Sequence, residues 1–161
     1  MKKIKLYLDT SVIGNLDEQS SPQDMAEAHA LWDLIKQGEF DVVISEVTLN
    51  EITANKNLDK VRTLLAYINE ITYESVSLDD EINHIADLVK QAGMIAADKH
   101  INDRRHIGCA LVARADILVS TNYDDLVNMG TILGVRKIAM VEGYGFIEIF
   151  TPRMVLKKGG K

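Results

Sequence analysis

Three acidic side chains stand at positions where a parallel sheet would gather them. Asp9 comes directly after an apolar run typical of a strand, Glu51 lies six residues beyond Ser45 and a second such run, and Asp103 opens a helical stretch. Ligand sites in open parallel sheets form at the carboxyl ends of the strands. Clustered carboxylates repel one another unless cations neutralise them, and hard oxygen ligands select Mg²⁺ or Mn²⁺. The pattern therefore favours a metal-dependent phosphodiesterase, which needs no protein nucleophile.

A fourth group of polar side chains follows another apolar run, at residues 116–120. This group consists of Thr121, Asn122, Tyr123, Asp124 and Asp125. His106 lies three residues after Asp103, which places both side chains on the same face of one helix. Polar residues thus follow three separate predicted strands or the helices that adjoin them.

Each of these positions also has a purely structural explanation. Asp9 could cap the turn that follows it, a role that Ser11 could share, and Asp103 could cap its helix because Asp is preferred there. Glu51 could lie on a solvated helix face. His106 is most readily explained as a packed, hydrogen-bonded side chain, and the last polar group could cap the next helix. Only the acids taken together favour a metal site.

Apolar patterns predict strands that alternate with helices. Short β-branched or alternating runs favour strands over residues 3–8, 40–45, 116–120 and 137–141, with an extended segment at 73–78 and an edge strand at 146–149. Capping residues and apolar stripes favour helices over residues 22–38, 47–54, 58–70, 78–93 and 103–113, and one further helix around 126–127. Strands separated by helices imply right-handed crossovers and a mostly parallel sheet, hence an α/β fold.

Length and composition indicate one globular domain. The 161 residues are 47% apolar and 26% charged, which is ordinary for a folded protein. The one cysteine argues against a disulfide framework and a thiolate zinc site, and no apolar run reaches the roughly 18 residues that a membrane span needs. We therefore expect a cytoplasmic domain over residues 1–156 that binds no membrane, followed by a flexible basic tail over 157–161.

The net charge of −6 argues against a general polyanion binder. The charge is unevenly distributed, however. Residues 1–97 carry eight Lys and Arg against 17 Asp and Glu, a balance of −9, whereas residues 98–161 carry ten against seven, a balance of +3. Two differently charged solvated faces would explain this distribution. The alternative is acidic chemistry in one region beside a basic surface elsewhere.

Four ordered motifs together resemble the PIN domain family. They are Leu6–Val12, Ser45 followed by Glu51, Asp103-x2-His106-Ile107-x2-Ala110, and Asp116–Asn122. Their order and spacing match over nearly the whole chain. The resemblance implies a three-layer α/β/α sandwich around a mostly parallel sheet. It also implies kinship with VapC-like ribonucleases of type II toxin–antitoxin pairs, in a subgroup somewhat longer than the minimal toxins.

The resemblance also implies roles for individual residues. Asp9, Glu51 and Asp103 match the acidic positions that bind Mg²⁺ or Mn²⁺ and support catalysis, and Asn122 or Asp124 would complete the site. Asn122 falls where many members have Asp, which removes one charge and should weaken metal binding.

Four neighbouring residues would contact the substrate. Thr10 and Ser11 match the hydroxyls that orient water or phosphate. Arg104 and Arg105 depart from the small or apolar pair that is usual before the His. They would hold phosphates if they line the cleft, because guanidinium groups suit that task; otherwise they are two exposed helix residues.

The function that follows is a divalent-metal-dependent endoribonuclease, in which metal-activated water attacks a phosphodiester bond of single-stranded or loop RNA. The resemblance also implies an antitoxin protein as partner and a homodimer. Trp32 and Met25 could contribute to such an interface, although their apolar stripe favours the core. The alternative is a catalytically weak or inactive PIN-like module that binds RNA or protein, for which Asn122 is the main support.

Overall fold

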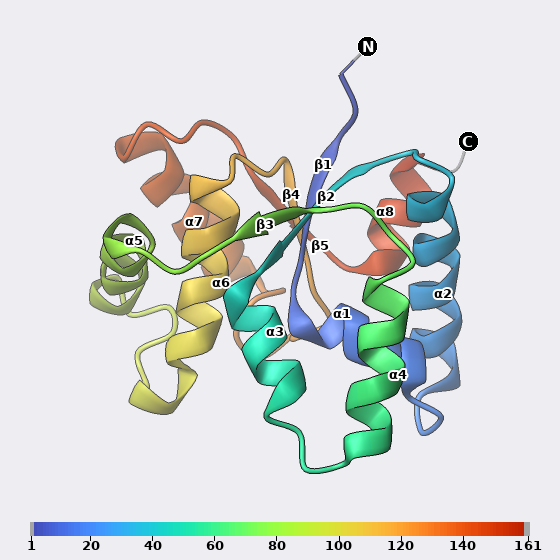
Figure 1. Cartoon of the computed structure of the whole chain (residues 1–161). Helices are drawn as coiled ribbons and strands as arrows, with labels where there is room; N and C mark the ends of the chain where they lie inside the picture. Colours follow the sequence, from blue (N-terminus) through green and yellow to red (C-terminus); the bar gives the residue numbers. More distant parts are fainter. Residues whose placement is uncertain (1, 160–161) are drawn as a thin grey trace.

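A five-stranded sheet forms the centre of the computed structural model, which describes residues 2–159 (Figure 1). The strands are β1 (Lys5–Leu8), β2 (Asp41–Ser45), β3 (Glu74–Val76), β4 (Ile117–Val119) and β5 (Glu148–Phe150). Their order across the sheet is β3-β2-β1-β4-β5, and every neighbouring pair is parallel. Parallel neighbours need crossover connections, so helices separate the strands along the chain. The predicted α/β class is confirmed.

Helices cover both faces of the sheet and make three layers (Figure 1). One face carries α1 (Thr10–Gly14), α2 (Pro22–Lys36), α4 (Leu58–Ile68) and α8 (Pro152–Gly159). The other face carries α5 (Asp80–Gln91), α6 (Ile101–Val112) and α7 (Met129–Val141). The remaining helix, α3 (Glu46–Thr53), follows β2 directly, and two short 3-10 helices are η1 (Asn15–Asp17) and η2 (Asp98–His100).

The alternation of side chains along β1 divides the core in two. Leu6 and Leu8 point into the layer that contains α2 and α4, whereas Tyr7 points into the layer that contains α5 and α6. This is the period-two arrangement of a strand that is buried on both faces. Trp32 of α2 is buried in the first layer, which confirms its predicted place in the core, and Met25 is half-buried.

The strand predicted at residues 137–141 is wrong, because these residues form the last turn and a half of α7. Asn128 caps that helix, with its side-chain oxygen accepting from the backbone N–H of Thr131 at 2.9 Å. Val135 and Ala139, four residues apart, are buried, while Met140 is 78% exposed. A short apolar run fits either element when it is considered alone. The place beside β4 is taken by β5, which confirms the predicted edge strand.

Two other boundaries differ from those predicted. Residues 126–127 lie in a turn, and the helix expected there begins only at Met129. The predicted domain boundary at residue 156 falls inside α8, which continues to Gly159, and residues 160 and 161 of the predicted tail lie outside the described residues. Within residues 2–159, none of the helices combines the length and the apolar character required to cross a bilayer.

Gly108 allows α6 to lie close to α5. A Cβ atom at this position would lie 2.6 Å from the carbonyl oxygen of Ile82. We expect Gly108→Ala to lower the free energy of unfolding by about 1–3 kcal/mol, because the added methyl group must push two packed helices apart. Gly130→Ala is the control, since its nearest neighbour would be a side-chain oxygen at 3.5 Å. Equal denaturation midpoints for Gly108→Ala and the wild type would contradict this packing.

Candidate metal centre

Asp9 lies at the point where β1 ends and α1 begins. Its backbone N–H donates to the carbonyl oxygen of Val119 at 3.0 Å, which holds the ends of β1 and β4 together. Its side chain makes no capping hydrogen bond to α1, so the structure does not support the capping explanation. Instead, the Oδ2 atom accepts from the hydroxyls of Ser11 at 2.8 Å and Ser120 at 2.7 Å. A buried carboxylate is thereby oriented by two hydroxyl donors from different elements.

Glu51 approaches the same place from α3. This helix starts directly after β2, where the side chain of Ser45 accepts from the backbone N–H of Thr48. The Oε1 atom of Glu51 accepts from the hydroxyl of Thr10 at 2.7 Å and from Nε2 of His106 at 2.6 Å. The side chain is therefore turned inward, and the solvated-face explanation is wrong.

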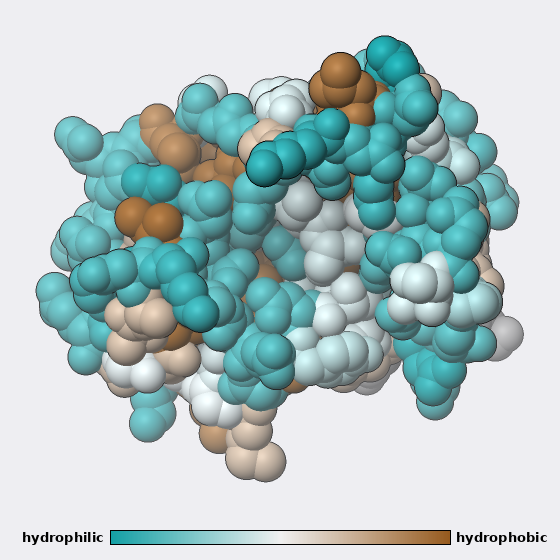
Figure 2. All heavy atoms as spheres, turned by 90° about the horizontal axis from the view of Figure 1, so that it is seen from below, coloured by the Kyte–Doolittle hydropathy of each residue, from teal (hydrophilic) through white to brown (hydrophobic). Residues whose placement is uncertain are grey.

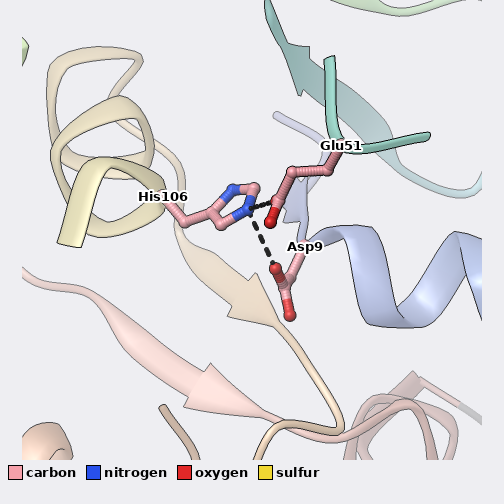
Figure 3. A group of neighbouring side chains, drawn as sticks. All are labelled: Asp9, Glu51 and His106. Carbon is pink, nitrogen blue, oxygen red and sulfur yellow. Dashed lines mark hydrogen bonds and ion pairs between the residues drawn. The ribbon is translucent and has the colours of Figure 1, made fainter. Parts of the chain in front are cut away.

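His106 of α6 joins the two acids (Figure 3). Its Nε2 atom lies 2.6 Å from Glu51 Oε1 and 3.2 Å from Asp9 Oδ1. The ring is fully buried, and its Nδ1 atom lies 2.6 Å from the hydroxyl of Tyr7. The expectation of a packed, hydrogen-bonded histidine is confirmed. We call Asp9, Glu51 and His106 the first group.

The charges of the first group shift one another's pKa values. Burial disfavours the imidazolium form, but the charges of Asp9 and Glu51 outweigh it and raise the pKa of His106. Burial likewise disfavours the Glu51 carboxylate, yet the hydrogen bond and charge of His106 outweigh it and lower the pKa of Glu51. The first group is therefore arranged to keep its acids ionised.

A second group of titratable side chains lies next to the first. His100, at the end of η2, has its Nδ1 atom 3.3 Å from Asp103 Oδ2 and 2.5 Å from Asp125 Oδ2. Burial, a hydrogen bond that protonated Asp103 can donate to Asp125, and the negative charge of Asp9 raise the pKa of Asp103 to about 7. Because Asp9 contributes to this shift, Asp103 lies within electrostatic range of the first group.

Each of the two groups has side chains that could hold a divalent cation. The ligand atoms within each group lie within 4.8 Å of one another. Four of the six side chains are carboxylates, which hard cations prefer. Like-charge repulsion already raises the pKa of Asp103, and a bound cation would relieve it.

Comparisons with solved structures agree on the fold. VapBC2 from Rickettsia felis, in a crystal structure bound to a promoter DNA fragment, aligns with a TM-score of 0.58 at 13% identity, covering 92% of this chain and 98% of that one. FitAB bound to the IR36 DNA fragment aligns at 0.57 and 17%, covering 91% and 94%. FitAcB from Neisseria gonorrhoeae aligns at 0.56 and 17%, covering 92% and 98%. The fold is PIN-like. No protein-family model and no curated protein sequence matches the chain.

The PIN-like fold brings together the three predicted acids but not Asp124. Asp124 is exposed and belongs to neither group, whereas Asp125, which was not singled out for the site, faces His100 and Asp103. The side-chain oxygen of Asn122 accepts from the backbone N–H of Asp125 at 3.1 Å, so Asn122 shapes the turn that carries Asp125. Whether Asp124 or Asp125 points toward the site depends on the conformation of that turn. The spacing of residues in the sequence does not reveal this conformation.

Arg104 and Arg105 differ in their surroundings. Arg104 is 4% exposed, and its Nη1 atom donates to the backbone carbonyls of Ile95 at 2.9 Å and Ala97 at 2.8 Å. The expectation of an exposed helix residue is wrong for Arg104, because its guanidinium donates hydrogen bonds to backbone carbonyl groups of the loop that precedes η2. Arg105 is half-buried and makes longer contacts of 3.4 Å to the side chains of Asn83 and Asn102.

We expect Arg104→Met to lower the free energy of unfolding by about 1–3 kcal/mol, because the buried carbonyl of Ile95 and the partly buried carbonyl contact of Ala97 lose their donor. Arg105→Met is a matched control from the adjacent position and should change stability by less than about 0.5 kcal/mol. Chemical denaturation measures both values. Equal effects of the two substitutions would show that the buried hydrogen bonds of Arg104 do not support the fold.

The raised pKa of Asp103 predicts a pH dependence of stability in the metal-free protein. Between the ordinary value of 3.8 and about 7, the folded state binds a proton that the unfolded state releases, so this contribution to stability falls as pH rises through that window. Asp103→Asn should remove that contribution and make the protein more stable than the wild type at pH 8, by roughly 0.5–2 kcal/mol. Thermal melts in chelator at pH 5 and pH 8 test this. A wild type that is the more stable protein at pH 8 would contradict it.

Proposed function

We propose that the chain is a divalent-metal-dependent endoribonuclease. The observation that carries this proposal is the convergence of Asp9, Glu51 and Asp103 from three different elements at the edge where the parallel strands end. Fold similarity alone does not imply an activity. Asp9 is buried and Glu51 and Asp103 are half-buried, so their mutual repulsion is an unfavourable arrangement that a cation-dependent reaction would explain.

The residues of the site divide into three roles. Asp9, Glu51 and Asp103 would hold Mg²⁺ or Mn²⁺, with Asp125 beside Asp103 in place of the predicted Asp124. When bound, a divalent cation would lower the pKa of a water molecule that it holds and would stabilise the negative charge that builds on a phosphate. The hydroxyl of Thr10 donates to Glu51 and so keeps that carboxylate turned into the site.

Ser11 links the two strand ends that carry the site. Its Oγ atom donates to Asp9 and accepts from the backbone N–H of Thr121 at 3.0 Å. The backbone after β4 is thereby fixed to the start of α1. In the proposed reaction Ser11 keeps the Asp9 carboxylate in place and Thr10 does the same for Glu51. Because each hydroxyl proton is already donated to an acid, we assign both residues to positioning the acids, in place of the predicted contact with phosphate.

The surface around the site suits a polar substrate. Figure 2 shows the molecule from the side on which the strands end, and this face is mainly hydrophilic. Arg105 is half-buried on the same helix as Asp103 and makes only long contacts to Asn83 and Asn102, so we propose it as the arginine that contacts phosphate, since the guanidinium of Arg104 is engaged inside the fold. Single-stranded RNA is the proposed substrate, because its splayed backbone reaches a shallow site.

A partner protein is the second part of the proposal. VapBC2 and FitAB, whose folds this chain shares, were each solved in complex with DNA. An antitoxin-like partner and a homodimer are the assemblies we propose here. Exposed apolar side chains on and after α7 offer a surface for such contacts: Met129, Leu133, Met140, Val141 and Phe146.

Hydrolysis of single-stranded RNA in Mn²⁺ tests the enzyme. Asp9→Asn and Asp103→Asn should each lower the cleavage rate by about 100-fold or more, because loss of residues that only support metal ligands already costs 10–100-fold. Asp124→Asn is the matched control and should cleave within about twofold of the wild type, since Asp124 belongs to neither group. Equal cleavage by all four proteins would overturn the assignment.

The alternative function is an inactive module that binds RNA or protein. Asn122 favours it, because an amide stands where many PIN domains have a carboxylate and its oxygen is engaged in a turn. Calorimetric titration with Mn²⁺ separates the two functions. Heat that Asp9→Asn abolishes supports the enzyme, whereas RNA binding without any metal binding supports the module.

A further inference from the structure

A line of hydrogen bonds runs from the protein core to the first group. The hydroxyls of Ser45 and Tyr7 lie 2.6 Å apart, and the Tyr7 hydroxyl lies 2.6 Å from Nδ1 of His106. On the other side of the ring, Nε2 lies 2.6 Å from Glu51. Ser45, Tyr7 and His106 are fully buried. The imidazole is therefore held from behind by the core and faces the acids in front.

The partners along this line decide where the protons lie. The backbone N–H of Thr48 donates to Ser45 Oγ, which leaves the Ser45 proton free to be donated to Tyr7, and the Tyr7 proton free to be donated to Nδ1. At Nε2 the nearest neighbours are carboxylate oxygens of Glu51 and Asp9, which can only accept. The Thr10 hydroxyl lies farther away, at 3.4 Å, and donates its proton to Glu51. A lone pair on Nε2 would face a negative oxygen of Glu51 at 2.6 Å and one of Asp9 at 3.2 Å. Nε2 must therefore carry a proton.

We propose that His106 is a positioning residue that aligns the acids of the proposed metal site through its Nε2–H, and that it is not itself a metal ligand. A ring nitrogen that carries a proton has no lone pair to offer a cation. By distance alone His106 could serve as a third ligand beside Asp9 and Glu51, and only the hydrogen-bond directions argue against this. Tyr7 and Ser45 are the residues that fix the ring.

This arrangement lets the two acids approach one another while leaving them able to bind a cation. Each carboxylate oxygen has two lone pairs, so an oxygen that accepts from Nε2–H retains a second site for a ligand. The His106 ring, hydrogen-bonded to Glu51 and 3.2 Å from Asp9, sets the spacing of the two acids in the metal-free fold. Supporting hydrogen bonds of this kind orient metal ligands before the metal arrives.

Histidine ¹⁵N NMR on the whole chain tests the proton position directly. In chelator, we expect His106 to show a protonated Nε2 that is hydrogen-bonded to carboxylate. Addition of Mg²⁺, which is diamagnetic, should leave that proton in place. An unprotonated Nε2 in chelator, or loss of the proton when Mg²⁺ binds, would overturn the proposal. This measurement needs no substitution at the buried ring.

Substitutions separate a positioning residue from a ligand. His106→Gln can present an amide N–H to Glu51, so its Mn²⁺ affinity should stay within about tenfold of the wild type, whereas His106→Leu should bind Mn²⁺ about 10–100-fold more weakly. Equal losses in both would contradict the proposal and indicate a ligand. His84→Gln is the matched control, because His84 is exposed and its contact is with Glu142.

Tyr7→Phe tests how the ring is held. It removes the hydroxyl that lies on Nδ1 while keeping the buried aromatic ring, and we expect Mn²⁺ affinity to fall about tenfold. An unchanged affinity and an unchanged His106 spectrum would exclude Tyr7 from the positioning role.

The inference rests on the proposed metal site, but its failure can be told from failure of that site. A wild type that binds no Mn²⁺ would refute the metal-dependent nuclease. The spectrum in chelator still decides whether His106 donates to the two acids.

Discussion

The contact of one buried imidazole with two carboxylates, Glu51 at 2.6 Å and Asp9 at 3.2 Å, is the interaction around which this edge of the molecule is arranged. Asp9 and Glu51 would repel one another in a site with little water, and burial of an unpaired charge is costly. His106 is hydrogen-bonded to Glu51 and lies 3.2 Å from Asp9, while the hydroxyls of Thr10, Ser11 and Ser120 donate to the two acids. The fold thus tolerates an acidic site in its metal-free state. Buried Tyr7 and Ser45 serve to hold the imidazole ring in place through their hydroxyl groups.

The parallel sheet is what makes this contact geometrically available. Because all five strands run in one direction, the segments that leave β1, β2 and β4 emerge at a single edge. A backbone hydrogen bond from Asp9 to Val119 joins the ends of β1 and β4. Helix α6 packs beside these strands and places His106 and Asp103 at the same edge. Residues about 40 to 110 positions apart therefore meet, which is the usual reason that open α/β sheets place ligands there.

Local patterns predicted what depends on local physics. The strand at β1 and the helices with strong caps and stripes follow from spacing, and so does an acid directly after a buried strand. The apolar run at 137–141 shows where this reasoning stops. Its composition fits a strand or a helix, and the cap at Asn128 together with the pairing of β5 beside β4 decides in favour of the helix. Residues 137–141 contain neither the capping residue Asn128 nor the strand β5, so their composition alone could not decide between strand and helix.

The sequence by itself determined the α/β class, the places of the five strands (with a sixth wrongly expected at 137–141) and the three acids whose positions follow strand ends. Only the tertiary structure decided that Asp125 rather than Asp124 joins them, that Arg104 donates to the backbone carbonyls of Ile95 and Ala97, and that His106 lies beside two carboxylates. The physical reason is that periodicity and capping act over a few residues. The direction of a side chain in a turn, and the partner of a buried charge, are set by contacts between segments that are distant in the chain.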